Sequence, residues 1–249
     1  MVINALISMV SWGGGGHLKR IDLKGFRGFT LAEVLITLVI IGVIASFVIS
    51  PMIQKQRELK TVSVVTKQYS VISQAWRRME QNYGPLDTWG MSNTNTGMLD
   101  ENNNTILDES GPELIRDRLG KFLQVTSYHS DSIEGKPVYR LSGEVHDSNL
   151  RDPMMILSDG SIMTIGWYTN GAVSLSLIVP PFDKIMYGKN TFYFKGYPYK
   201  VLPEGTPDTN GFQSQCFTMG RSCTAWVIYN KNLDYLHCND LSWSGKKKC

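Results

Sequence analysis

Residues 28–50 read GFTLAEVLITLVIIGVIASFVIS, an apolar run that contains one acid, Glu33. The part from Leu31 to Ser50 has 20 residues, and a helix of that length rises about 30 Å, the thickness of the hydrocarbon core of a bilayer. This stretch therefore predicts a membrane-spanning helix. Glu33 requires an explanation, because a carboxylate in the middle of a membrane costs about 2.5–3.5 kcal/mol and such residues are usually functional.

The formal net charge of the chain is +3, and it resides in residues 1–28. The charged residues of this segment are Lys19, Arg20, Asp22, Lys24 and Arg27. Because basic flanks stay in the cytoplasm, we expect the N-terminus inside and the C-terminus outside. Acids and bases balance in the rest of the chain. This balance argues against nucleic acid as a partner, because a phosphate-binding surface normally shows a basic excess.

Glu33 lies near the cytoplasmic end of the predicted helix, and no Lys or Arg occurs between Phe29 and Gln54. A cut between Gly28 and Phe29 would create a positive charge, the new α-amino group, about one helical turn from Glu33. The amine of an adjacent subunit could pair with the acid in the same way. We interpret Glu33 as a register device, since subunits that slide past each other would stop where acid meets amine.

An ordinary secretory signal peptide is the alternative for this segment. Its apolar region normally has about 7–15 residues and is followed by a cleavage site with small residues. The run here is longer, and the best such site, around Ala45 and Ser46, lies inside it. The pattern therefore favours a membrane helix that is retained.

Residues 24–38, KGFRGFTLAEVLITL, resemble the N-terminal signature of type IV prepilins and type II secretion pseudopilins. The resemblance covers about the first quarter of the chain. It implies that a prepilin peptidase in the inner membrane cuts after Gly28 and methylates Phe29. Glu33 would then be the fifth mature residue, the acid typical of the family. A leader of 28 residues is long for this family; either the leader is unusual, or translation starts later, at Met9 or at a non-Met start codon.

We expect the helix to continue to Tyr83 and to end at Gly84-Pro85, with a kink at Pro51. Apolar residues recur beyond Pro51 at spacings of three and four, which predicts one buried face: Val62, Val65, Tyr69, Ile72, Trp76, Met79 and Tyr83. A coiled coil is the alternative for this part. The pattern covers only three heptads and a globular region follows, so packing against a sheet is favoured.

The remaining chain predicts a sheet. Residues 84–111 are rich in Asp, Asn, Thr, Ser and Gly and predict a mobile surface loop, and residues 112–123 predict a short helix. Strands are expected at 154–157, 161–167, 172–179, 190–194, 225–229 and 233–237, the first two joined by a tight Asp159-Gly160 turn. A long helix followed by an antiparallel sheet is an α+β fold, here pilin-like.

Four cysteines lie in the last 34 residues: Cys216, Cys223, Cys238 and Cys249. An extracytoplasmic location favours disulfides, and four cysteines allow three connectivities. Nearest-neighbour pairing would close two short loops, and the other pairings stay open. A zinc site with His237 is an alternative, but no paired C-x-x-C occurs, and His237 and Cys238 would point to opposite faces of a strand.

Other sites have weaker signals. Major pseudopilins bind calcium in a C-terminal loop, and the candidates here are Asp183, Asp208 and Asn210, but no dense run of alternating Asp and Asn ligands occurs. No other cofactor and no catalytic site is expected, so the chain is not expected to be an enzyme. Lys246, Lys247 and Lys248 are interpreted as a solvated charge cluster.

These observations divide the chain into a leader (1–28), a membrane or filament-core half of the helix (29–51), an amphipathic half (52–83) and an extracytoplasmic globular domain (84–249). They predict a structural subunit of a type IV pilus-like or type II secretion-like filament. The resemblance implies other pilin or pseudopilin subunits, the prepilin peptidase and an inner-membrane assembly platform as partners. The expected location is the bacterial inner membrane, then a periplasmic or cell-surface filament.

Two other functions stay open. A minor pilin would act in adhesion or DNA uptake, through the loop at 84–111 or the C-terminal disulfide region. A membrane-anchored extracytoplasmic enzyme would need a convergent polar site, which the sequence does not indicate.

Overall fold

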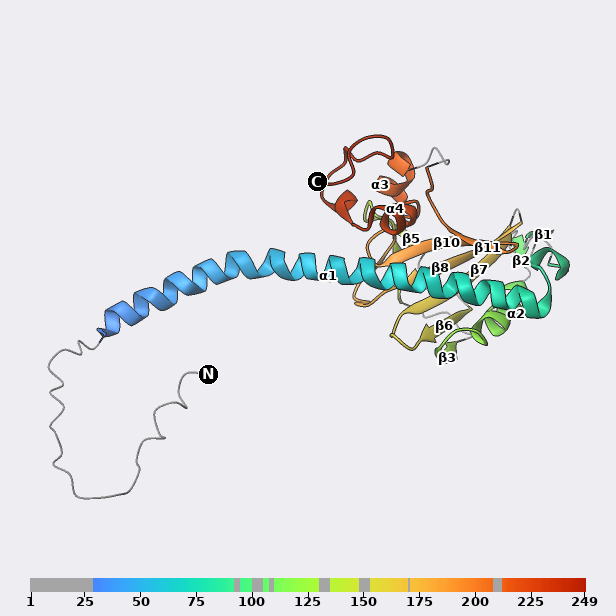
Figure 1. Ribbon diagram of the computed structural model, residues 1–249, viewed down its shortest axis with the longest axis horizontal. Helices are drawn as coiled ribbons and strands as arrows, with labels where there is room; N and C mark the ends of the chain where they lie inside the picture. The colour runs from blue at the N-terminus through green and yellow to red at the C-terminus, as the bar shows by residue number, and fades with distance from the viewer. Residues whose placement is uncertain are drawn as a thin grey trace, which may run out of the picture. The chain divides into compact units, whose positions relative to one another are not determined.

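The structure is a computed structural model that describes residues 29–91, 95–99, 105–107, 110–129, 135–147, 153–169, 171–207 and 212–249. Contacts within the chain separate two units, Met1–Ser50 and Pro51–Cys249. One helix, α1 (Leu31–Tyr83), has residues in both units, and Pro51 lies inside it (Figure 1). The predicted helix is confirmed at both ends, and the kink at Pro51 stays a prediction.

The part of α1 in the first unit is apolar on all sides. From residue 31 to residue 49 the side chains are exposed, apart from the half-buried Ala45. A helix that is hydrophobic all round belongs in a membrane or in the core of an assembly. Among the described residues, α1 is the one helix that is long and apolar enough to cross a bilayer.

The part of α1 in the second unit is amphipathic, as predicted. Its buried face carries Val62, Val65, Ile72, Trp76 and Met79, while Tyr69 and Tyr83 pack against the same core. The helix is followed by Gly84, whose φ of +84° suits glycine at a helix C-terminus. The short helical segment η1 (Leu86–Thr88) follows, and Leu86 returns to the core.

The core of the second unit is a six-stranded antiparallel sheet of order β11-β10-β8-β7-β6-β3. Its strands are β3 (Val125–His129), β6 (Met154–Leu157), β7 (Ile162–Thr169), β8 (Ala172–Ile178), β10 (Thr191–Tyr197) and β11 (Lys200–Pro203). The part of α1 in the second unit packs on this sheet (Figure 1). There the Trp76 indole N–H donates to the Tyr197 carbonyl at 2.9 Å. Helix α2 (Ser110–Gly120) packs near β6 and β7.

Two smaller sheets and a helical C-terminal region complete the second unit. Strand β1 (Asn95–Leu99) pairs with β2 (Thr105–Leu107), and a three-stranded sheet has the order β5 (Val145–Asp147), β4 (Val138–Tyr139), β9 (Ile185–Met186). The C-terminal helical segments are η2 (Phe212–Cys216), α3 (Phe217–Met219), α4 (Cys223–Asn230) and η3 (Asp234–Leu236).

The α+β class, the α2 segment and the hairpin at Asp159-Gly160 are confirmed. The strands predicted at 225–229 and 233–237 are wrong, because these residues lie in α4 and η3. Residues 223–228 are all buried, and a short run that is apolar on every side does not distinguish a strand from a buried helix. The loop prediction for 84–111 is wrong in part, since β1, β2 and η1 lie within it.

Candidate processing and assembly site

Glu33 takes part in a reciprocal hydrogen-bond motif at the N-terminus of α1. The amide and the hydroxyl of Thr30 donate to Glu33 Oε2 at 2.8 and 3.0 Å, and the amide of Glu33 donates to Thr30 Oγ1 at 3.2 Å. This is a capping box, in which the first and fourth residues satisfy each other's backbone N–H groups. The spacing Thr-x-x-Glu before an apolar run predicts a capping box from the sequence alone, but the predicted site did not include Thr30.

The capping box is important in lipid, where water cannot satisfy the free N–H groups of a helix end. It pairs two of those donors and gives the Glu33 carboxylate two neutral partners within its own helix. The interpretation of Glu33 as a register device that pairs with a Phe29 amine stays a prediction. Glu33 already has hydrogen-bond partners that do not depend on the cut, and the amine would add a charge.

Phe29 is at the exposed start of the described chain, with 87% of its surface accessible. Phe29 and Thr30 are not helical, so the expected cut falls before the first turn of α1. Gly28 and the leader lie outside the described residues. Cleavage after Gly28 and methylation of Phe29 therefore stay predictions.

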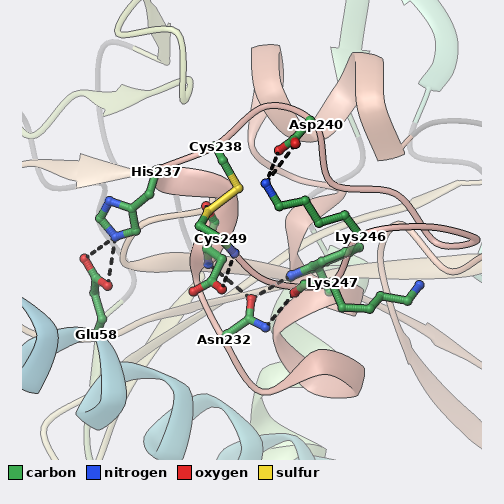
Figure 2. Close-up of a disulfide and its surroundings, with 10 residues drawn as sticks. Glu58, Asn232, His237, Cys238, Asp240, Lys246, Lys247 and Cys249 are labelled. Carbon is green, nitrogen blue, oxygen red and sulfur yellow. Dashed lines mark hydrogen bonds and ion pairs between the residues drawn. A yellow bond between two sulfur atoms is a disulfide. The ribbon is translucent and has the colours of Figure 1, made fainter.

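The four cysteines form two disulfides in the second unit. Cys216 bonds to Cys223 and Cys238 bonds to Cys249, with Cα atoms 4.7 and 6.1 Å apart, which is the nearest-neighbour pairing. Figure 2 shows the second disulfide beside His237 and the C-terminal lysines. Because all four sulfurs are used in disulfides, the zinc alternative has lost its thiolate ligands.

The solvated charge cluster predicted for the C-terminal lysines is confirmed in part, because Lys246 and Lys248 are exposed and Lys247 is half-buried. The Lys247 ammonium lies 5.5 and 5.3 Å from the ring centroids of Trp226 and Trp243, and it donates to the carbonyls of Ser242 and Trp243. Lys246 forms an ion pair with Asp240 at 2.8 Å (Figure 2). Lys247 thereby attaches the C-terminal segment to Trp226 of α4, whereas the Lys246–Asp240 pair lies within that segment.

Of the three calcium candidates, the structure describes only Asp183. Asp183 is exposed, and Asp208 and Asn210 lie outside the described residues. Within the described part of the chain, no group of three or more His, Cys, Asp or Glu residues could hold a metal ion.

Residues 23–49 match the family model of the prokaryotic N-terminal methylation motif. No curated protein and no solved structure gives a significant match to the chain. The matched segment includes the expected cut at Gly28, the capping box and the apolar part of α1 up to Ile49. The resemblance found in the sequence is thereby confirmed: the chain carries the N-terminal signature of type IV prepilins and pseudopilins.

Proposed function

We propose that the chain is a structural subunit of a type IV pilus-like or type II secretion-like filament. A prepilin peptidase removes residues 1–28 and methylates Phe29. The observation that supports this proposal is α1 itself, which is apolar and exposed from Leu31 to Ile49 and then supplies the core of a globular unit from Val62 onward. Such a helix needs partners along its first half, and the resemblance of the matched segment to prepilins implies that other subunits supply them.

The orientation and the course of assembly follow from the same segment. The basic leader stays in the cytoplasm and the domain from residue 84 onward lies outside. On extraction, the apolar residues of α1 exchange lipid for the helices of neighbouring subunits. Lipid tails are as apolar as leucine, so this exchange has little hydrophobic driving force and depends on packing and polar contacts.

Glu33 supplies the polar contact that fixes the register. Thr30 donates to Oε2, so Oε1 can accept a hydrogen bond from a Phe29 amine, either of the same subunit or of a neighbour. A charged pair in a low-dielectric helix bundle is strong when its partners meet and costly when they do not. The pair sets the register when the amine belongs to a neighbouring subunit, because assembly out of register then leaves Glu33 without it.

The maturation step is tested by mass spectrometry of the protein from a bacterium that contains a prepilin peptidase. The expected product begins at Phe29 and carries one methyl group on its amine. The variant Gly28→Val should accumulate as the precursor, because a branched side chain replaces glycine at the cut. Gly25→Val, a glycine in the same leader, is the matched control and should be processed. A different mature N-terminus, or normal processing of Gly28→Val, would overturn the proposal.

A role in DNA uptake or adhesion would make the chain a minor subunit of the same class. The internal contacts of Lys246 and Lys247 count against DNA binding at the C-terminal segment. We therefore favour the structural subunit, with other subunits, the peptidase and an inner-membrane assembly platform as partners.

A further inference from the structure

The two disulfides differ in their access to solvent. Cys216 and Cys223 are both completely buried in the main core, whereas Cys249 is exposed and Cys238 is half-buried. Thiol–disulfide exchange begins when a thiolate reaches a disulfide sulfur, so access decides which bond reacts first. A dithiol added from solution should therefore reduce Cys238–Cys249 before Cys216–Cys223.

The accessible disulfide adjoins a contact between the C-terminal segment and α1. His237, the residue before Cys238, places Nε2 at 3.0 Å from both carboxylate oxygens of Glu58 (Figure 2). The His237 side chain is 41% exposed and that of Glu58 is 20% exposed. Glu58 lies about one helical turn before Val62, where the buried face of α1 begins. The contact thus extends the attachment of α1 toward Pro51.

The rest of the C-terminal segment has fastenings that do not need this disulfide. The Asn232 side-chain amide donates to the Lys247 carbonyl at 3.1 Å, and the Cys249 amide donates to Asp234 at 3.0 Å. The Lys247 ammonium is held by two tryptophan rings and two carbonyls. Reduction should therefore leave the domain folded. The His237 and Cys238 amides keep their bonds to the Asp234 carbonyl at 2.9 and 3.1 Å, so the part that loosens is the contact of the His237 side chain with Glu58.

We propose that Cys238–Cys249 is a redox-sensitive latch on α1. In the oxidised form it holds His237 against Glu58, so that residues 54–61 of α1 are attached to the domain. In the reduced form this contact is weakened, and the attached part of the helix begins at Val62. The latch is a property of the second unit and does not depend on the proposed filament function.

The Cys238–Cys249 disulfide is reduced by thiol–disulfide exchange, and an external dithiol supplies the electrons and protons. One thiolate of the dithiol attacks the exposed Cys249 sulfur, the bond to Cys238 breaks, and the Cys238 thiolate takes up a proton. The second thiol of the reagent then attacks the mixed disulfide, closes its own disulfide and releases Cys249 as a thiol. Two electrons and two protons pass from the dithiol to the protein.

The test uses the full chain in detergent micelles and graded dithiothreitol. Alkylation with iodoacetamide followed by peptide mass spectrometry reports which cysteines are reduced. Cys238 and Cys249 should be labelled at concentrations that leave Cys216 and Cys223 unlabelled. Labelling of both pairs together, or of Cys216 and Cys223 first, would overturn the proposal.

Amide hydrogen exchange, measured on the same samples, shows whether residues 54–61 of α1 are released when Cys238–Cys249 is reduced. Selective reduction should accelerate exchange in residues 54–61 by roughly two- to fivefold, the range expected when one partly exposed polar side-chain contact is lost, while the sheet strands keep their protection. Unchanged exchange in 54–61 would contradict the latch. Faster exchange throughout the sheet would also contradict it, because the effect would then be general unfolding.

A variant separates the contact from the disulfide. His237→Ala should accelerate exchange in residues 54–61 while Cys238–Cys249 stays oxidised, and reduction should then add little more. The matched control is His129→Ala, an exposed histidine on β3 far from the latch in the sequence. If His237→Ala and His129→Ala behave alike, the His237–Glu58 contact does not hold the helix.

Discussion

Replacement of Glu80 should destabilise the second unit more than replacement of any exposed acid. Glu80 lies on α1 with only 3% of its surface exposed. Its Oε1 accepts the Leu86 amide at 2.9 Å and its Oε2 accepts the Tyr199 amide at 2.6 Å. One carboxylate therefore joins the end of the long helix to the segment that follows it and to the turn between β10 and β11.

The magnitude follows from the two backbone donors. Glu80→Ala leaves two N–H groups without their acceptor, and an unsatisfied buried donor costs about 1–3 kcal/mol. We expect a loss of about 2–6 kcal/mol in the free energy of unfolding. Glu80→Gln keeps one oxygen but turns an amide group toward the other donor, so it should lose about half as much. Denaturant unfolding of the full chain in micelles, followed by tryptophan fluorescence, measures both.

The pH dependence gives an independent check. The pKa of the Glu80 carboxyl lies above its ordinary value of 4.5, chiefly because the side chain is buried. The hydrogen bonds from the Leu86 and Tyr199 amides lower this pKa, and the nearby charge of Asp87 raises it, but the net direction is upward. A raised folded-state pKa means that the native state holds the proton more tightly. This contribution is fully present below about pH 4.5 and is lost as the pH rises through the folded pKa.

Wild type should therefore gain stability relative to Glu80→Gln as the pH falls through this window. The matched control is Glu113→Gln, an exposed acid on α2 that should change the free energy of unfolding by less than about 0.5 kcal/mol. If Glu80→Ala lowers the free energy of unfolding by no more than this control does, the hydrogen bonds from the Leu86 and Tyr199 amides do not stabilise the fold as argued.

Three further predictions concern the core, a turn and the N-terminus of α1. Gly196→Ala should cost at least about 1–3 kcal/mol, because its new Cβ would lie 2.4 Å from the Trp76 ring; a thermal midpoint equal to wild type would refute this. Burial raises the pKa of Asp159, but hydrogen bonds from Gln68 and Ser161 lower it more, so the pKa lies below its ordinary value of 3.8. The stabilisation from Asp159 is therefore present above about pH 3.8 and lost as the pH falls through the lower folded pKa, and an acid titration of Asp159→Asn should lack this component. Glu33→Ala should be processed by the peptidase but fail to enter filaments. Thr30→Val, which loses the hydroxyl but keeps the acid at residue 33, should assemble with reduced yield. Filament incorporation of Glu33→Ala at the wild-type level would refute the register role.

The sequence predicted the elements whose periodicity is strong and local. The spacing of Val65, Ile72, Trp76 and Met79 marked the buried face of α1, and the Asp159-Gly160 turn marked a hairpin. The strand prediction for 225–229 failed because every side chain from Cys223 to Ile228 is buried, so no alternation separates helix from strand. Short strands such as β4 and β9 have two residues each and leave no periodic signal.

The polar contacts could not be predicted from local patterns. Glu80 and Lys247 belong to residue types that are normally solvated, and their partners are distant in the sequence or are backbone groups. Thr30 was the exception, because its capping-box spacing with Glu33 is visible in four consecutive residues. Cleavage and assembly were inferred from the matched signature, and their chemistry depends on partners outside this chain.

The attachment of α1 within the second unit also has a mechanical consequence. Tension applied along the part of α1 that follows Pro51 reaches the sheet through side chains of its buried face. These include Tyr69, which donates to the Val201 carbonyl, and Trp76, which donates to the Tyr197 carbonyl. A force along the helix axis loads these contacts in shear, so all of them must break together. The attachment therefore resists such a force better than a force that would break the contacts one after another.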